Sequence, residues 1–127
     1  MKKFNPVVWF EIYVNDLNRA ALFYESVLQV SLNDMTDPSD KTIQMKGFPG
    51  DMENYGANGA LVKMDAAKPS ANGSMIYFGF DDCKEPEDRV RDNGGKIIKS
   101  KMSIGEHGFV SIVMDTEGNS IGFHSMK

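Results

Sequence analysis

Apolar and polar residues alternate most clearly between residues 7 and 14, and this period of two predicts a β-strand. One face of the strand is wholly apolar and carries Val8, Phe10, Ile12 and Val14. The other face carries Trp9, Glu11 and Tyr13, so that a carboxylate lies between two aromatic rings. Such a face is either a solvated exterior or the wall of a cavity.

The spacing of apolar residues becomes helical directly after this strand. From Leu17 to Leu28 they recur every three or four positions, which predicts a helix with Asp16 as its N-cap. A second strand over 75–80 is followed by Asp82 and Glu85, which resemble a capping box. This second helix is expected to end at Asn93–Gly95, where a glycine can adopt a left-handed conformation.

The two strand–helix junctions resemble one another. "IYVNDL" and "FGFDDC" align position for position, with Asp16 matching Asp82 at an offset of 66 residues. This offset is about half the chain and suggests a duplicated unit. "DAAKPSANG", residues 65–73, has the composition of a linker. We therefore expect one domain over 1–127, with a first module over 1–64 and a second over 74–127.

The remaining strands complete the same order in both modules. In the second, the last two strands are joined by a tight turn at "TEG". In the first, residues 30–34 supply the missing member, so each module is predicted to be β-α-β-β-β. The other expected strands are 41–46, 59–64, 95–100, 108–115 and 119–125.

Composition and charge exclude several classes of function. The formal net charge of −4 and the pI near 5.1 leave no basic field for phosphate backbones, so nucleic acid is not an expected partner. The single cysteine, Cys83, permits no intrachain disulfide. No apolar stretch approaches the roughly 18 residues of a membrane span. We expect a cytoplasmic protein that does not bind membranes.

Three segments carry a resemblance to a known family: "YVNDLNRAALFYESVL", "IYFGFDD" and "MDTEGNSIGFHS". The chain resembles a bacterial branch of the vicinal oxygen chelate superfamily, which includes glyoxalase I, bleomycin and fosfomycin resistance proteins and extradiol dioxygenases. The resemblance implies an α+β fold. Two βαβββ modules would form a curved, cup-shaped mixed sheet with helices on its outer face. Trp9, Glu11 and Tyr13 would then point into the cup, together with Met75 and Tyr77.

The resemblance also locates the positions at which metal-dependent members hold their ion. These fall on Trp9, on Met75, which is seven residues before Asp82, and on Gly122 in the last strand. Indole offers only an N–H donor, a thioether is a weak soft ligand, and glycine has no side chain. We therefore expect neither the usual metal ion nor another cofactor.

The remaining polar candidates are Glu11, His107 and His124. Glu11 and His124 could form an acid–base pair, or all three could form a two-histidine, one-carboxylate metal site. The structural alternatives are an exposed His124 near the C-terminus, a His107 set by loop geometry, and a Glu11 bonded to backbone amides or a tyrosine hydroxyl. Uncompensated burial of the Glu11 charge would be costly, so a donor, water or a ligand is expected beside it.

Two functions follow, and the third reading is structural. The first is a metal-independent protein that binds a small organic molecule, as bleomycin resistance proteins do. The second is a lyase or isomerase for a small oxygenated substrate, with Glu11 as general base and His124 as a second catalytic group, or with an atypical metal. The third is a cup filled by its own side chains. The resemblance implies a homodimer, and the expected ligand-binding residues are Trp9, Tyr13, Met75, Tyr77 and His107.

Overall fold

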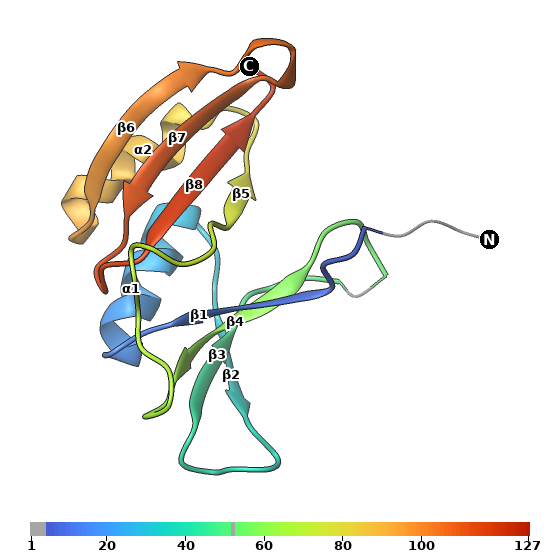
Figure 1. Cartoon of the computed structure of the whole chain (residues 1–127), viewed down its shortest axis with the longest axis vertical. Coiled ribbons are helices and arrows are strands. Elements are labelled where there is room, and N and C mark those ends of the chain that lie inside the picture. Colours follow the sequence, from blue (N-terminus) through green and yellow to red (C-terminus); the bar gives the residue numbers. More distant parts are fainter. Residues whose placement is uncertain (1–4, 52) are drawn as a thin grey trace.

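The computed structural model describes residues 5–51 and 53–127. Each half of the chain contains a strand, a helix and three further strands, as the duplicated pattern predicts (Figure 1). The first half comprises β1 (Trp9–Tyr13), α1 (Leu17–Leu28), β2 (Asn33–Thr36), β3 (Gln44–Gly47) and β4 (Asn58–Lys63). The second comprises β5 (Tyr77–Gly79), α2 (Lys84–Val90), β6 (Lys96–Ser103), β7 (Phe109–Met114) and β8 (Ser120–Ser125), with 3-10 turns η1 (Arg91–Asn93) and η2 (Gly105–His107).

The strands form two four-stranded mixed sheets with the same topology. Their orders are β1-β4-β3-β2 and β5-β8-β7-β6. In each sheet the first strand of the module pairs in parallel with the last, and the other pairings are antiparallel. The predicted α+β architecture of two βαβββ modules is therefore confirmed.

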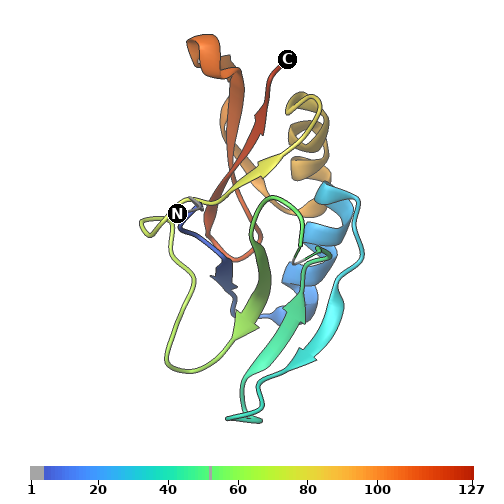
Figure 2. The ribbon, with the colours of Figure 1, turned by 90° about the vertical axis from the view of Figure 1, so that its right-hand side faces the viewer.

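The two modules share one hydrophobic core. Its members come from both helices and from the helix-side faces of both sheets, including Ile12 of β1, Val14 directly after it and Phe123 of β8. The rings of Phe10 in β1 and Phe78 in β5 meet edge to face at 6.2 Å. In Figures 1 and 2 the two helices lie next to one another on the same side of the molecule, and they contact one another. The modules thus pair within one chain through their helix sides.

Local signals at the helix ends are borne out in part. Asp16 caps α1 as predicted, since its carboxylate accepts a hydrogen bond from the Arg19 amide at 3.0 Å. Gly94 takes the expected left-handed conformation after the second helix, with φ of 91°. The capping box before α2 is wrong. Asp82 instead accepts from the Lys84 amide at 2.9 Å and pairs with Lys101 at 2.8 Å.

Several strands are shorter than predicted because each extends only as far as a neighbouring strand pairs with it. The first begins at Trp9, which pairs with Asn58 at the start of β4. The expected strand over 75–80 shrinks to three residues, so that Met75 precedes β5. The strand expected over 30–34 is present but lies at 33–36, where every residue is exposed. No helix of the described residues is long and apolar enough to cross a membrane.

Glu117, in the turn between β7 and β8, joins the second module to the start of α1. Its buried carboxylate accepts hydrogen bonds from the amides of Asn15 and Asp16, at 2.9 and 2.8 Å. The Arg19 guanidinium adds a two-point ion pair, at 2.7 and 2.9 Å. Burial alone would raise the pKa of Glu117. The hydrogen bonds from Arg19, the two amides and Thr116 outweigh burial and lower the pKa to about 2.

The same turn also holds β1 and the linker between the modules. Tyr24 of α1 donates its hydroxyl hydrogen bond to Asp115 at 2.5 Å, and both groups are buried. Asn119 donates to the Tyr13 carbonyl at 2.8 Å and accepts from the Ser70 amide at 2.9 Å. The relative positions of β1, β8 and the linker are therefore set by one turn.

Candidate functional site

Glu11 lies at the centre of β1 with both carboxylate oxygens already engaged. The Trp9 indole Nε1 donates to one oxygen at 3.2 Å, and the Tyr13 hydroxyl donates to the other at 3.0 Å. The three side chains meet because strand alternation puts positions 9, 11 and 13 on one face. Partial burial, the hydrogen bond to Glu11 and the charge of Glu11 raise the pKa of Tyr13, which keeps its hydroxyl protonated as a donor.

A cavity of about 290 Å³ lies beside this group of side chains. Glu11 and Tyr13 line it from β1, Lys68 lines it from the linker and Ser74 from the residue after the linker, and Ser120 lines it from the start of β8. The cavity therefore combines a carboxylate, an ammonium group and hydroxyls. Isoleucines at 12, 76 and 121 supply apolar surface between the two modules. This mixture suits a small molecule that has both polar groups and a short apolar part.

The other aromatic and thioether candidates lie outside that cavity, on β1, on β5 and just before β5. Trp9 is 39% exposed, Met75 37% and Tyr77 48%. The Tyr77 ring lies across Gly122 of the neighbouring strand, so that a side chain at position 122 would collide with it. The faces that the resemblance places inside a cup are thus directed away from the shared core, and within one chain they are only partly covered.

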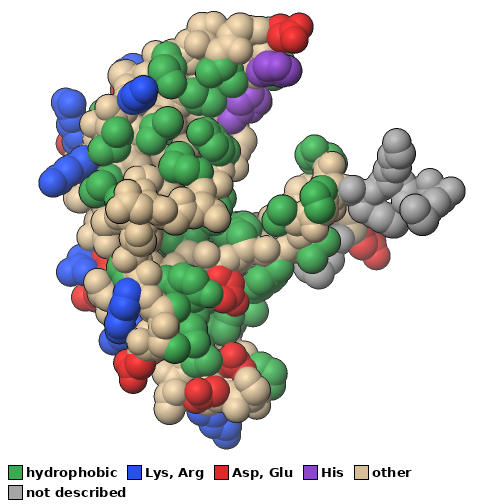
Figure 3. All heavy atoms as spheres, in the orientation of Figure 1, with side chains coloured by type: hydrophobic (Ala, Val, Ile, Leu, Met, Phe, Trp, Pro, Cys, Tyr) green, Lys and Arg blue, Asp and Glu red, His purple; other side chains and the backbone are tan. Residues whose placement is uncertain are grey.

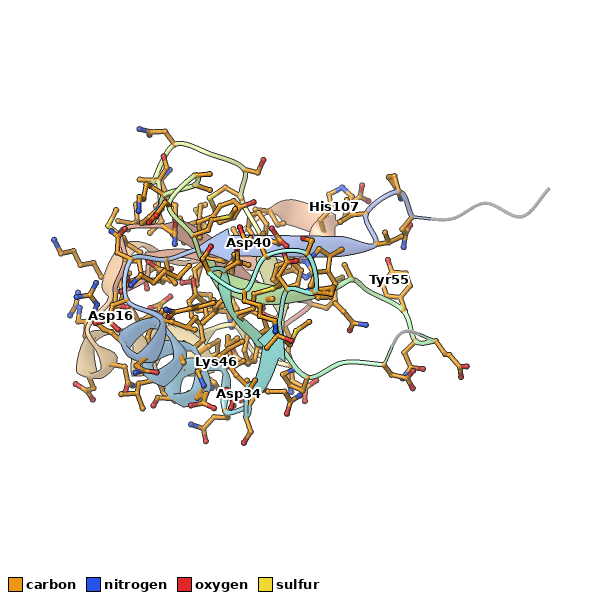
Figure 4. All side chains as sticks on the ribbon, turned by 90° about the horizontal axis from the view of Figure 1, so that it is seen from below. Asp16, Asp34, Asp40, Lys46, Tyr55 and His107 are labelled. Atoms are coloured by element: carbon orange, nitrogen blue, oxygen red, sulfur yellow. The ribbon has the colours of Figure 1, made fainter. Side chains whose placement is uncertain are left out.

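The two histidines lie together, but at a different place from Glu11. The His124 ring Nε2 is 2.7 Å from the carbonyl oxygen of His107, and His107 itself is exposed beside Glu106. Figure 3 shows both histidines at one end of the molecule, and Figure 4 labels His107. Among the described residues no hydrogen bond joins Glu11 to His124. The alternative two-histidine, one-carboxylate site is wrong for the single chain, because no three metal-ligating side chains in residues 5–51 and 53–127 are grouped closely enough to hold an ion.

The side chains at the superfamily's metal positions do not fit a metal ion. The Trp9 N–H is directed at Glu11, where it acts as a donor and offers no lone pair. Gly122 has no side chain, and the Tyr77 ring occupies the space above it. Met75 contributes only a thioether, a soft and weak ligand for the ions that prefer oxygen or nitrogen.

Lys68 and Ser74 were not expected at a site. Lys68 belongs to the linker and Ser74 directly follows it, and glycine, proline and serine in this segment indicate only an irregular connection. The linker approaches β1 because Asn119 holds the Ser70 amide. No pattern among neighbouring residues predicts that the linker approaches β1.

Comparison with known proteins agrees with the fold. The model of the glyoxalase/bleomycin resistance protein/dioxygenase superfamily matches residues 6–123. The chain belongs to this superfamily. A glyoxylase-like domain-containing protein from Didymella fabae is 30% identical over 113 residues, which are 87% of this chain and 85% of that protein.

Solved structures of superfamily members share the fold at low sequence identity. A glyoxalase/bleomycin resistance protein from Albidiferax ferrireducens T118 has a TM-score of 0.70 and 17% identity, over 94% of this chain and 98% of that one. The trypanothione-dependent glyoxalase I of Leishmania major has a TM-score of 0.69 and 22% identity, over 97% of this chain and 88% of that one. Glyoxalase I from Zea mays has a TM-score of 0.73 and 17% identity, over 93% of this chain but only 43% of the maize chain.

Proposed function

We propose that this superfamily member binds a small organic molecule at the Glu11 cavity, without the superfamily's usual metal ion. The observation that carries the proposal is the Glu11 carboxylate, fixed by Trp9 and Tyr13 at the wall of a cavity of about 290 Å³. A carboxylate has about four lone-pair sites, so two bound donors leave room for a donor on the ligand. Lys68 offers a positive charge to an acidic or carbonyl group of the same ligand.

The donor chemistry supports the part of the proposal that concerns the metal. An indole N–H, a thioether and a glycine stand where metal-dependent members hold their ion. Elemental analysis of protein purified without chelator tests this part separately. A stoichiometric divalent ion in that protein would overturn it.

Trp9 makes the binding test direct, because it is the only tryptophan of the chain and contacts Glu11. Dicarbonyl and aromatic ligands would be titrated against its fluorescence and by calorimetry. We expect Glu11→Gln to weaken a bound ligand by about 10- to 100-fold, the usual cost of a hydrogen bond to a charged group. Glu106→Gln, an exposed site, is the matched control and should leave affinity unchanged. Equal affinity in both variants would remove Glu11 from the site.

We also propose that a second copy completes the cup. Trp9 of β1 and Tyr77 of β5 are exposed on open sheet faces, and Met75 is exposed just before β5. Figure 3 shows apolar side chains gathered over the second sheet. Tyr55, in the loop before β4, projects outward with 93% exposure (Figure 4). Packing the first module of one chain against the second module of another would cover both faces in a two-fold homodimer.

Light scattering tests the dimer. The wild type is expected at twice the chain mass, and Tyr77→Asp is expected to be monomeric because it places a charge on the covered face. Leu22→Asp, at an exposed position of α1, is the control and should remain dimeric. A monomeric wild type would contradict the proposal, as would dissociation by Leu22→Asp alone.

A lyase or isomerase activity is the second candidate. It is favoured by one observation: the Glu11 carboxylate lines a cavity beside the Tyr13 hydroxyl instead of being sealed in the core. A carboxylate in this position can act as a general base that removes a proton from a carbon next to a carbonyl group. Exchange of such a proton for deuterium, followed by NMR, would reveal the activity. Turnover that Glu11→Gln leaves unchanged would exclude Glu11 as the base.

A further inference from the structure

A second cavity, of about 220 Å³, opens on the helix side of the molecule. Four phenylalanines line it: Phe10 of β1, Phe48 after β3, Phe78 of β5 and Phe80 after it. None of the described residues that line it carries a charged or hydrogen-bonding side chain. It thus has the opposite chemistry to the cavity at Glu11.

The two cavities lie at different positions along the same two segments, since Phe10 and Phe78 line one and Ile12 and Ile76 line the other. Phe10 follows Trp9 and precedes Glu11 in β1, so its side chain lies on the opposite face of the sheet from theirs. Phe78 is related to Tyr77 in the same way in β5. The two cavities have no lining residue in common. The phenylalanine cavity is therefore a separate place in the fold, formed where the helix sides of the two modules meet.

The rings are held in fixed positions from behind. Phe48 lies 5.5 Å from Phe10 and 5.7 Å from Phe78, centroid to centroid, in tilted arrangements. The fully buried ring of Tyr24 packs against Phe48 at 5.6 Å and Phe78 at 6.1 Å. Its hydroxyl is bonded to Asp115, which fixes the ring in place. Aromatic rings at these distances and angles present both edges and faces to a further ring.

We propose that this cavity binds a neutral, monocyclic aromatic molecule. The cavity is open on one side, where Pro49 and Gly79 are exposed. An apolar cavity of about 150 Å³ is large enough to accept benzene. A volume of about 220 Å³ accommodates one ring with a small substituent. A charged ligand would lose its hydration and gain no partner from the lining side chains.

Toluene is the probe for the test, with benzoate and benzylammonium as charged analogues of the same shape. Each would be titrated into the full chain and followed by NMR. We expect saturable shifts at Phe10, Phe48 and Phe78 with toluene, and at least tenfold weaker binding of both ions. Ala57→Leu places a larger side chain at the cavity wall and should weaken toluene binding at least tenfold. Ala71→Leu makes the same change in the exposed linker and should not.

The outcomes that overturn the proposal are equally specific. They are the absence of saturable toluene shifts, binding of either ion as tightly as toluene, and shifts confined to Trp9 and its neighbours. Dissociation of a dimer by toluene would also overturn it, because a second copy would then be the occupant. If Ala57→Leu does not fold, Val30→Phe fills the same cavity and replaces it in the test. The toluene-induced NMR shifts of the wild type also show by themselves whether toluene binds at the phenylalanines.

Discussion

Replacement of Glu117 by glutamine is expected to destabilise the protein by about 3 kcal/mol at neutral pH. Glutamine resembles the protonated carboxyl group, so the loss is set by how far folding lowers the pKa of Glu117, from 4.5 to about 2. Each unit of pKa difference corresponds to about 1.4 kcal/mol, so this lowering corresponds to about 3 kcal/mol. The Glu117 carboxylate is buried, but the Arg19 side chain is 53% exposed, so solvent screens part of the ion pair and the expected loss is kept at about 3 kcal/mol. A domain of this size has about 5–15 kcal/mol of stability in total.

The pH dependence follows from the same shift. Because the pKa of Glu117 is lower in the folded protein, its stabilisation is complete above pH 4.5 and is lost as the pH falls towards 2. Urea unfolding, followed by circular dichroism at a series of pH values, measures both effects. Glu117→Gln should be less stable at pH 7 and should lose part of the acid dependence. Glu106→Gln is the matched control, because that side chain is 88% exposed. A change below about 1 kcal/mol in Glu117→Gln, or an unaltered acid dependence, would refute the reasoning.

Three further substitutions test the packing that positions the sites, with urea unfolding as the measurement. Tyr24→Phe removes the buried hydrogen bond to the Asp115 carboxylate and is expected to cost about 1.5–3 kcal/mol; a loss under about 0.5 kcal/mol would show that the bond contributes little. Gly59→Ala would force a methyl group against the Phe10 ring, which the aromatic cluster holds, and should cost about 1–3 kcal/mol. Gly122→Ala meets the exposed Tyr77 ring, which can move aside, and should cost less than about 1 kcal/mol. Equal losses at the two glycines would contradict this distinction.

Features that depend on neighbours in the sequence were predictable. The alternation around Glu11 correctly placed Trp9 and Tyr13 on its face, because residues two apart in a strand point the same way. The cap at Asp16 and the left-handed Gly94 follow from equally local chemistry. The duplicated order of elements was visible because both junctions keep the same short pattern.

Features that depend on distant residues were not predictable in the same way. The turn at "TEG" indicates a hairpin, but nothing near Glu117 shows that its carboxylate binds amides about 100 positions earlier. Lys68 reached the cavity only because Asn119 holds the linker. The phenylalanines likewise read as ordinary core, since an apolar pattern predicts burial but not the space left between modules.

The burial of Glu87 could have been predicted from the sequence, although its partners could not. It lies four residues after Cys83 and three before Val90, so helical spacing puts it on the buried face of α2. Burial would raise the pKa of Glu87, but hydrogen bonds from Lys84, from two serine hydroxyls and from the Lys101 amide lower it to about 2. A carboxylate on an apolar helix face predicts such partners, although not their identity.

The long reach of Glu117 has a consequence for the newly made chain. A ribosome makes α1 about 100 residues before the carboxylate that bonds the amides of Asn15 and Asp16. Until then Arg19 lacks Glu117 as its ion-pair partner, and the apolar face of the helix has no second module to cover it. The nascent first module is therefore expected to depend on chaperones that shield apolar surface, and to reach its final packing only when the last hairpin has emerged.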